Sequence, residues 1–476
     1  MTEMIRIPRV VIAAAGSGQG KTSVATGLLA ALRLRGLNVS GHKVGPDYID
    51  PGYHALAAGR PGRNLDPWLV GEENIRPMFV HGASTPELAD LAVIEGVMGL
   101  FDGAVGHGSF ASTAHVATLL QAPVVLVVDA SAVGRSAAAL VHGFATFDPT
   151  VRLAGVILNR VGSERHEQIM RSAMDEVGVP VVGVVHRQER LATPARHLGL
   201  VPVAERTVEA TETVAALGAV VASGVDLEAV IRIASSAPEL PAVGASAEDS
   251  VARAAEPEVR PVIAVAGGPA FTFGYTETIE LLTAAGAEVR TFDPIHHDRL
   301  PPGTAGLIIG GGFPEVYAEA LSANTALRAE VRELIARDVP ISAECAGLLY
   351  LTRSLDQYPM VGVLDAESEM GPRLILGYRD AVALNDSVLT PAGARVRGHE
   401  FHRTTCTPRS GARPAWRWPD AEPEGFVAGN MHASYLHLHW SGVPGIANRF
   451  VAAAIRTGPA PIGTAAALPA GERTAR

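Results

Sequence analysis

Cysteine is scarce in this chain, which has only Cys345 and Cys406 among its 476 residues. Two cysteines are too few for a disulfide framework in a protein of this length, so the sequence favours a reducing compartment. Positive charge is also in deficit, because 39 Lys and Arg stand against 49 Asp and Glu, a formal net charge of −10. A surface with no excess of positive charge argues against nucleic acid and anionic membranes as partners.

The chain also lacks any hydrophobic run of the ~20 residues that a transmembrane helix needs. The apolar run 10–15 near the N-terminus is too short for the hydrophobic region of a signal peptide. With 47% hydrophobic and 18% charged residues, the composition is far from that of a disordered chain. We therefore expect a folded, soluble, cytoplasmic protein without a membrane segment.

Apolar segments rich in β-branched residues alternate with amphipathic segments through the first part of the chain. This pattern is typical of βαβ units around a mostly parallel sheet. The expected strands are 10–15, 38–44, 91–97, 124–129, 154–159 and 181–185. The expected helices between them are 21–34, 111–120, 133–144 and 164–177.

The alternation stops in residues 236–260, which are rich in Ala, Glu, Ser and Pro, and it restarts at Pro261. The expected strands of the second part are 262–266, 288–292, 306–309 and 339–343, and its expected helices are 275–285 and 326–337. The sequence therefore predicts an α/β protein with two domains. We expect a P-loop-type domain at 1–235, a linker at 236–260, a second α/β domain at 261–456 and a mobile tail at 457–476.

A glycine loop between the first expected strand and the first expected helix has the features of a phosphate-binding site. Gly18 and Gly20 allow backbone N–H groups to turn toward an anion, and the helix N-terminus adds positive potential. Lys21 can reach the β- and γ-phosphate oxygens, and the hydroxyl of Thr22, followed by Ser23, can bind Mg²⁺. Alanine replaces the first glycine of the G-x-x-x-x-G-K-[ST] pattern, so a glycine-rich turn that binds nothing is the alternative.

Two acidic residues follow expected strands of the same sheet. Asp47 lies in HKVGPDYIDP (42–51), and Glu95 lies in IEGVMG (94–99). Ligands collect at the carboxyl ends of the strands in an open α/β sheet, and Mg²⁺ prefers oxygen ligands. Each acid alone is more often a solvated loop residue or a helix cap. Beside a phosphate loop, both are candidate Mg²⁺ ligands.

Cys345 stands between an expected strand and a run of small residues, in ISAECAGL (341–348). Such an elbow places the sulfur at a helix N-terminus, where the helix dipole favours thiolate and the Ala346 N–H can stabilise an oxyanion. The glycine loop 310–312, directly after another expected strand, offers further N–H donors. A buried, inert cysteine is the alternative. Cys406 has neither feature, and we expect it to be passive.

A thiol nucleophile needs a general base, which is often distant in sequence. Three histidines, at positions 432, 437 and 439, lie within one segment near the C-terminus. Another histidine-bearing segment, GHEFH (398–402), has strand-like character, and its spacing differs from that of the zinc motif H-E-x-x-H. We therefore do not expect GHEFH to bind a metal.

The N-terminal motifs together carry a family resemblance. The loop 15–23, KVGPDYIDP (43–51) and IEGVMGLFDG (94–103) resemble the ATP-dependent domain of cobyrinate and hydrogenobyrinate a,c-diamide synthases, which are related to dethiobiotin synthetase. The RHLGLV segment (196–201) is also similar to this family. The resemblance implies that Thr22, Asp47 and Glu95 bind Mg²⁺, that Lys21 and Lys43 bind phosphate, and that Asn159 faces adenine. A turn residue at a strand end is the alternative for Asn159.

The C-terminal motifs carry a second resemblance. GGGFPE (310–315), ECAG (344–347) and SYLHLH (434–439) resemble the class I-like glutamine amidotransferase domain of cobyrinate and cobyric acid synthases. This resemblance implies that Cys345 and His437 form the pair that hydrolyses glutamine. Many such enzymes have a His-x-Glu sequence, whereas His439 occupies the acidic position here. The group that orients His437 is therefore left open.

The two resemblances imply one reaction in cobalamin biosynthesis. ATP would activate the a and c acetate carboxylates of hydrogenobyrinic or cobyrinic acid as acyl phosphates, and ammonia from L-glutamine would displace the phosphate. The alternatives are cobyric acid synthase, a nickel-sirohydrochlorin diamide synthase and, from another class, a nucleotide-switch ATPase of the chromosome-partitioning type. The metal state of the corrinoid, the order of the amidations and the oligomeric state, a homodimer included, are left open.

Overall fold

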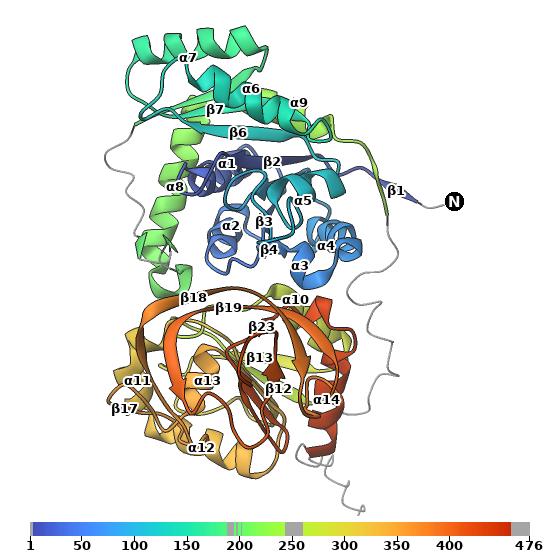
Figure 1. Cartoon of the computed structure of the whole chain (residues 1–476), viewed down its shortest axis with the longest axis vertical. Helices are drawn as coiled ribbons and strands as arrows, with labels where there is room; N and C mark the ends of the chain where they lie inside the picture. Colours follow the sequence, from blue (N-terminus) through green and yellow to red (C-terminus); the bar gives the residue numbers. More distant parts are fainter. Residues whose placement is uncertain (1–2, 188–194, 197–198, 201, 243–259, 458–476) are drawn as a thin grey trace, which may run out of the picture.

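The first part of the chain forms a seven-stranded parallel sheet, in the upper half of Figure 1. The computed structural model describes residues 3–187, 195–196, 199–200, 202–242 and 260–457. The strand order is β4-β3-β5-β2-β6-β7-β8, and every neighbouring pair is parallel. The strands are β2 (Arg9–Ala14), β3 (Val39–Val44), β4 (Arg63–Leu65), β5 (Leu91–Glu95), β6 (Val124–Asp129), β7 (Leu153–Val161) and β8 (Val181–His186).

Helices cover both faces of this sheet. One face packs against α1 (Lys21–Leu34), α2 (Asp50–Ala58), α8 (Thr207–Gly224) and α9 (Leu227–Ser235). The other packs against α4 (Glu72–Ser84), α5 (Thr113–Leu119), α6 (Ala137–Phe147) and α7 (Glu164–Val177). In β2, Val11 and Ala13 belong to one hydrophobic cluster, and Ile12 and Ala14 belong to the other. A strand buried on both faces has a continuous apolar sequence, which is the signal that predicted β2.

The elements expected in this part of the chain are confirmed. All six expected strands are present, and none of their ends moves by more than two residues. Helices α1 and α7 have the expected bounds. Helix α6 begins at Ala137 rather than at Val133, because the intervening residues form turns after Asp129 accepts the N–H of Ser131.

The second part of the chain contains two sheets. The larger has the order β13-β12-β14-β15-β22-β21 and is parallel except between β21 and β22. Its strands are β12 (Val262–Ala266), β13 (Glu288–Phe292), β14 (Thr304–Ile309), β15 (Ile341–Glu344), β21 (Phe426–Ala428) and β22 (Met431–Ser434). The helices packed around it are α10 (Thr276–Ala284), α11 (Ala318–Ala323), α12 (Thr325–Ala336), α13 (Ala346–Leu351) and α14 (Ile446–Thr457).

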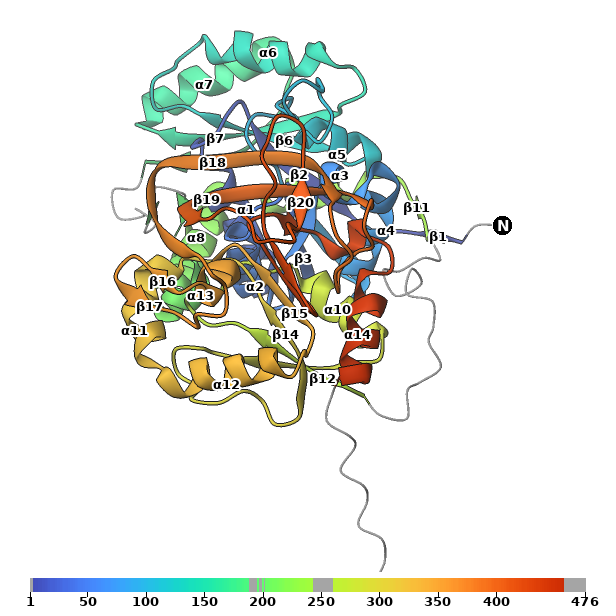
Figure 2. The same ribbon diagram turned by 60° about the horizontal axis from the view of Figure 1, so that its bottom comes forward.

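The smaller sheet is built on a long antiparallel hairpin that the sequence did not predict. The hairpin consists of β18 (Glu367–Ala383) and β19 (Arg395–Thr407). The short strands that extend it are β16 (Ser354–Leu355), β17 (Tyr358–Pro359), β20 (Trp416–Arg417) and β23 (His437–Leu438). Figures 1 and 2 show the hairpin on the side of the second domain that faces the first.

The beginning of the expected linker lies against the first domain. Strand β11 (Leu240–Pro241) pairs with β1 (Met4–Ile5), and the N–H of Ala242 donates to the carbonyl oxygen of Glu3 at 2.7 Å. The rest of the expected linker, from residue 243 to 259, lies outside the described residues. So does the expected tail beyond Thr457, the last residue of α14.

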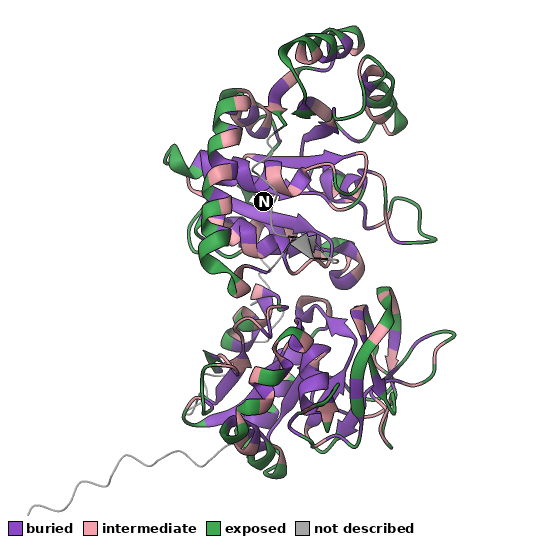
Figure 3. Cartoon of the chain, turned by 90° about the vertical axis from the view of Figure 1, so that its left-hand side faces the viewer, coloured by how far each residue is buried: buried purple, intermediate pink, exposed green. Residues whose placement is uncertain are grey.

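A buried polar interface joins the two domains. The guanidinium of Arg63 on β4 lies 3.1 Å from Glu277 and 2.7 Å from Glu280, both on α10. Tyr378 on β18 donates a 2.8 Å hydrogen bond to Asp66 at the start of α3 (Pro67–Val70). Figure 3 shows most strands inside each domain buried, whereas the outer helices, the loops and one long strand of the second domain carry exposed residues. Separating the domains would leave the buried Arg63 charge without its carboxylates, which opposes separation.

His432 on β22 should make the stability of the second domain depend on pH. Its ring is buried and lies 5.0 Å from that of Trp416, and burial lowers the pKa of His432 to about 3. The unfolded chain takes up this proton near pH 6.5, so the free energy of unfolding should fall as pH drops from 6.5 toward 3, by about 1.4 kcal/mol per pH unit. We expect His432→Phe to remove this contribution. Urea unfolding of both proteins at pH 7, 6 and 5 measures it, and parallel pH dependences would contradict the assignment.

Candidate active sites

The glycine loop joins the end of β2 to the start of α1, as the sequence predicts. Gly18 and Gly20 have φ angles of 74° and 98°, which residues with a side chain rarely adopt. The ammonium of Lys21 donates to the carbonyl oxygens of Gly16 at 2.8 Å and of Met98 at 2.6 Å. Burial lowers the pKa of Lys21 to about 8. Lys21 therefore connects the glycine loop to the segment that follows β5.

Asn159, near the end of β7, lies directly against this loop. Its Nδ2 donates a 2.9 Å hydrogen bond to the carbonyl oxygen of Gln19. A Cβ atom on Gly20 would lie 2.1 Å from the same Nδ2. The positive φ angle therefore favours glycine at position 20, and a side chain there would displace the amide of Asn159. Ser23, the third of the expected phosphate-loop residues, is half-buried in the first turn of α1.

Gly20→Ala should lower the affinity for ATP by about 10- to 100-fold, because backbone strain of this kind costs on the order of 1–3 kcal/mol. Gly16→Ala is the matched control. Its Cβ would lie 3.7 Å from Gln19 Nε2, an ordinary contact, so we expect affinity near that of the wild type. Titration calorimetry with a nonhydrolysable ATP analogue measures both variants. Equal losses of ATP affinity in the two variants would show that the loop has no special need for glycine at position 20.

Oxygen donors of three side chains converge beside the loop. Thr22 Oγ1 lies 2.5 Å from Glu95 Oε1 and 3.3 Å from Asp50 Oδ2. Lys43 Nζ lies 2.7 Å from both carboxylates, and His54 Nε2 lies 2.7 Å from Glu95 Oε2. The structure thus brings together the expected residues Thr22, Lys43 and Glu95 and adds Asp50 and His54.

The charges of this cluster compensate one another. Burial opposes the charge of Lys43, but Asp50 and Glu95 outweigh it and raise the pKa of Lys43. Burial also opposes the charge of Glu95, yet Lys43 and His54 hold the pKa of Glu95 well below its usual range. Burial, followed by the charges of Asp47 and Glu95, raises the pKa of Asp50. An added cation would therefore favour the ionised form of Asp50.

Asp47 has a different position from the one that the sequence implies. Its Oδ1 accepts the N–H groups of Ile49 at 2.7 Å and Asp50 at 2.9 Å, at the start of α2. The aspartate that approaches the hydroxyl of Thr22 is Asp50. One hydroxyl and two carboxylates suit Mg²⁺, which takes its remaining oxygen ligands from phosphate and water. No group of three or more His, Cys, Asp or Glu side chains among the described residues is arranged to hold a metal ion.

Cys345 lies at the turn between β15 and α13, the elbow that the sequence predicts. Its φ of 49° and ψ of −100° are unusual for a residue with a side chain, and such strain concentrates at functional sites. The turn is held by a 2.8 Å hydrogen bond from the Cys345 N–H to the carbonyl oxygen of Ser434. A Cβ atom on Gly347 would lie 2.2 Å from the carbonyl oxygen of Ile309. The tight packing of the elbow therefore explains the glycine two residues after Cys345.

The thiol of Cys345 is not a ready thiolate, contrary to what the sequence implies. Burial, followed by the charge of Glu315, raises the pKa of Cys345, although the N–H of Ala346 acts in the opposite direction. Desolvation of the charged form therefore outweighs the favourable helix N-terminus. A nearby base has to remove the thiol proton before the sulfur can attack.

His437, on β23, is buried and faces Glu344, the residue that precedes Cys345. Strand pairing places it opposite His399 on β19, and the two rings stack with centroids 5.0 Å apart. The ring of Tyr48, from the first domain, lies 5.4 Å away. His437 Nδ1 is 3.7 Å from Glu344 Oε2. A Cβ atom on Gly311 would lie 2.5 Å from His437 Cε1, so the glycine loop makes room for the imidazole.

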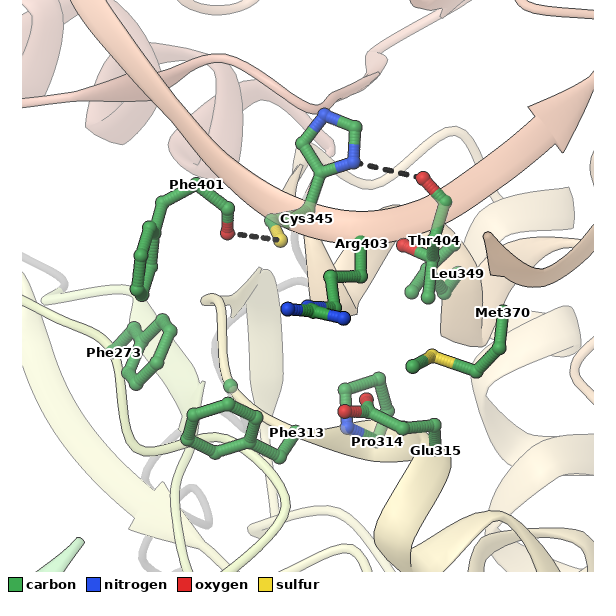
Figure 4. A pocket seen from close by; sticks show the side chains of 12 residues that line it. Phe273, Phe313, Pro314, Glu315, Cys345, Leu349, Met370, Phe401, Arg403 and Thr404 are labelled. Carbon is green, nitrogen blue, oxygen red and sulfur yellow. Dashed lines mark hydrogen bonds between the residues drawn. The ribbon is translucent and has the colours of Figure 1, made fainter. Parts of the chain in front are cut away.

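A pocket opens beside Cys345 and is shown in Figure 4. Apolar side chains form much of its wall, and Arg403 and Glu315 contribute one guanidinium and one carboxylate. Its lining residues are Phe273, Gly312, Phe313, Pro314, Glu315, Cys345, Leu349, Met370, Phe401, His402, Arg403 and Thr404. Of the predicted glycine-loop donors, Gly312 lines the pocket, whereas the N–H of Gly311 donates to the carbonyl oxygen of Phe273 at 3.2 Å. One positive and one negative side chain beside the sulfur are the charges that would pair with a small zwitterionic ligand.

Two family models match the chain. The CobQ/CobB/MinD/ParA nucleotide binding domain matches residues 10–201, and the CobB/CobQ-like glutamine amidotransferase domain matches residues 262–444. Hydrogenobyrinate a,c-diamide synthase of Streptomyces coelicolor is 58% identical over 474 residues, covering 94% of this chain and 97% of the relative. The enzyme of that name from Thermobifida fusca is 56% identical over 460 residues, with the same coverage of both chains. Cobyrinate a,c-diamide synthase of Gloeobacter violaceus is 46% identical over 447 residues, covering 93% of this chain and 96% of the relative. The chain belongs to the a,c-diamide synthase family.

Membership of the a,c-diamide synthase family confirms the predicted combination of a nucleotide-binding domain with a glutamine amidotransferase domain. It removes the chromosome-partitioning ATPase as an interpretation of the whole chain. Residues 197, 198 and 201 of the RHLGLV segment (196–201) lie outside the described residues. None of the helices in the described ranges combines the length and apolar character needed to span a bilayer.

Two further sequence features of this a,c-diamide synthase have structural positions. GHEFH (398–402) forms part of β19, as its strand-like sequence indicates. Cys406, on the same strand, is buried, and burial followed by the charge of Glu424 raises its pKa to about 12. Unlike Cys345, Cys406 lies inside a strand and has no strand-to-helix turn beside it.

Residues of this a,c-diamide synthase that sequence reasoning missed include Asp50 and Glu344. Asp50 stands three residues after Asp47 in the same motif and directly before a proline, so it resembled a helix-start residue. Glu344 directly precedes Cys345 in the elbow, and the motif alone gives this glutamate no chemical role. Its position next to a candidate nucleophile is the signal in the sequence that points to Glu344.

Proposed function

We propose that this protein uses ATP and glutamine to amidate the a and c acetate side chains of hydrogenobyrinic or cobyrinic acid. The names of relatives that match over nearly their full length support this substrate class, a corrinoid polycarboxylate. In this proposal, residues 1–235 bind ATP and the corrinoid, and residues 261–456 release ammonia from L-glutamine. Both described cysteines are free, which fits the reducing cytoplasm, where ATP is available.

The observation that carries the proposal is that the two candidate sites share a boundary. Tyr48 belongs to the segment that holds Asp47 and Asp50, and its ring stacks on Phe273 of the second domain at 5.0 Å. The same ring lies 5.4 Å from His437. Nitrogen released beside His437 therefore emerges near the segment where the carboxylate is activated, as transfer between the sites requires.

Glutamine hydrolysis would begin with proton transfer from the Cys345 thiol to His437. The sulfur would then attack the side-chain carbonyl carbon of glutamine, and the N–H of Ala346, which faces the thiol, would stabilise the negative oxygen. His437 returns the proton to the leaving nitrogen, which departs as ammonia. Water hydrolyses the remaining thioester, which releases glutamate and restores the thiol.

Carboxylate activation would take place at the glycine loop. A substrate carboxylate oxygen attacks the γ-phosphorus of ATP, ADP leaves, and an acyl phosphate forms. In this proposal Lys21 and Lys43 stabilise the phosphate charge and Asn159 contacts the adenine, and the contacts of Lys21 and Asn159 with the glycine loop support these roles. Ammonia attacks the acyl carbon and phosphate leaves, which produces the amide. Mg²⁺, if held by Thr22, Glu95 and an aspartate of the GPDYID segment, would neutralise phosphate charge.

Mass spectrometry of the products tests this function. The protein is incubated with ATP, Mg²⁺, glutamine and either hydrogenobyrinic or cobyrinic acid. We expect ATP-dependent formation of a monoamide and then a diamide, each step replacing OH by NH₂. Amidation that continues beyond the diamide, or that takes place only on nickel sirohydrochlorin, would assign the chain to another tetrapyrrole amidase.

A further inference from the structure

The group that orients His437 is the missing part of the glutaminase site. A general-base histidine needs one ring nitrogen held by a partner, so that the other nitrogen faces the nucleophile in the correct tautomer. His437 is buried, and neither of its ring nitrogens has a hydrogen-bond partner among the residues that the structure describes. Its orienting group has to come from the polar side chains that face the ring.

His439, at the position where many amidotransferases have the acid, does not fill this role. Its Nε2 lies 3.7 Å from Glu277 Oε2, at the domain interface, where Glu277 also pairs with Arg63. The ring of His439 packs against Tyr275, with centroids 4.2 Å apart. His439 and Glu277 therefore belong to the contact between the domains.

Glu344 faces His437 from the end of β15. Its Oε2 lies 3.7 Å from His437 Nδ1, and the Glu344 side chain is 17% exposed. Glu344 is the last residue of β15, and β15 pairs in parallel with β22. Strand β22 ends at Ser434, three residues before His437. The other titratable rings around His437 are those of His399 and Tyr48, at 5.0 Å and 5.4 Å. Glu344 supplies the carboxylate of this set.

We propose that Glu344 is the positioning residue of the glutaminase, completing a Cys345–His437–Glu344 triad in which acid and nucleophile are adjacent in sequence. The inference rests on the proposed glutaminase function. Glu344 holds the Nδ1–H of His437, which leaves Nε2 to take the thiol proton and return it to the leaving ammonia. The Nδ1–Oε2 separation of 3.7 Å has to shorten to about 3 Å when glutamine binds, as catalytic hydrogen bonds often do.

Glu344→Gln tests the proposal, because the amide keeps the shape and removes the charge. We expect the kcat of glutamine hydrolysis to fall by about 10- to 100-fold, the effect of losing one hydrogen bond to a charged group. The KM for glutamine should stay near the wild-type value, since Glu344 is not among the residues that line the pocket. Glu344→Asp, which keeps the charge, should recover part of the kcat. Ammonia-dependent diamide synthesis should be unchanged in both variants.

A double-mutant cycle separates positioning from a structural role. If Glu344 acts through His437, Glu344→Gln should cost nothing further in a His437→Ala background. Glu277→Gln, which alters the other carboxylate–histidine pair, is the matched control and should retain the glutaminase kcat. The proposal is overturned if Glu344→Gln keeps full kcat, if its effect adds to that of His437→Ala, or if ammonia-dependent synthesis falls equally. A wild-type protein without glutaminase activity would instead overturn the proposed function.

Discussion

Replacing Cys345 with alanine should abolish glutamine-dependent diamide synthesis and leave ammonia-dependent synthesis intact. Glutamine releases nitrogen only after a thiolate attacks its side-chain carbonyl, and free ammonia bypasses that step. We expect the glutamine-driven rate to fall by at least about 10³-fold, since removing a nucleophile usually has an effect of this size or larger. The measurement compares diamide formation with glutamine and with an ammonium salt at mildly alkaline pH.

Two variants serve as controls for this result. His437→Ala should behave like Cys345→Ala, because burial keeps the thiol protonated unless a base removes the proton. Cys406→Ala should retain both activities, since Cys406 lies within β19 and is not among the residues that line the pocket beside Cys345. The assignment of the nucleophile fails if Cys345→Ala retains glutamine-driven turnover. The division of labour between the domains fails if a folded Cys345→Ala protein loses the ammonia-driven reaction.

The parts of the fold that the sequence predicts are those with a strong local signal. Helix α7 begins after Ser163, whose hydroxyl accepts the N–H of His166, and it ends at Gly178, whose φ is 69°. Both residues are helix-boundary signals that can be recognised without a structure. The buried parallel strands are equally recognisable, because β6 is continuously apolar up to its last residue, Asp129.

The hairpin of β18 and β19 has no comparable signal. Most residues of β18 between Glu367 and Ala383 are exposed or half-buried, so its hydrophobic pattern alternates poorly. Its position depends on contacts far away in sequence, such as the hydrogen bond from Tyr378 to Asp66 and the stacking of Tyr378 on Trp68 with centroids 5.1 Å apart. Local periodicity cannot report such contacts.

In the candidate sites, too, the sequence predicts the residues that a local motif marks and misses the properties that depend on tertiary contacts. Gly20, Lys21 and Cys345 could be identified because a short motif places each of them at a strand-to-helix turn. The raised pKa of the Cys345 thiol could not be predicted, because it results from burial and from the Glu315 charge, which only the tertiary structure brings near. The choice between Asp47 and Asp50 also depends on the tertiary structure, since either residue could follow β3 as a metal ligand.

Lys21→Ala should produce the opposite pattern to Cys345→Ala, with synthesis lost for both nitrogen donors and glutamine hydrolysis retained. Lys21 acts on the phosphate before nitrogen arrives, so supplying ammonia cannot rescue the variant. We expect synthesis to fall by about 10²- to 10³-fold, the usual effect of removing a charge that stabilises a phosphoryl transition state. Diamide formation with each donor and glutamate release are measured on the same preparation. Rescue by ammonia would remove Lys21 from the phosphate site.

Asp50→Asn and Asp47→Asn extend this test to the metal ligands. Asp50→Asn removes a charge from the donor set next to Thr22, so we expect a loss of synthesis similar to that of Lys21→Ala and a higher Mg²⁺ requirement. Asp47→Asn keeps the Oδ1 that accepts the N–H groups of Ile49 and Asp50, so the start of α2 is preserved. If Asp47 only caps that turn, the variant should synthesise diamide at close to the wild-type rate. A large loss in Asp47→Asn with normal synthesis in Asp50→Asn would instead make Asp47 the ligand, and the contact between Thr22 and Asp50 would then be structural.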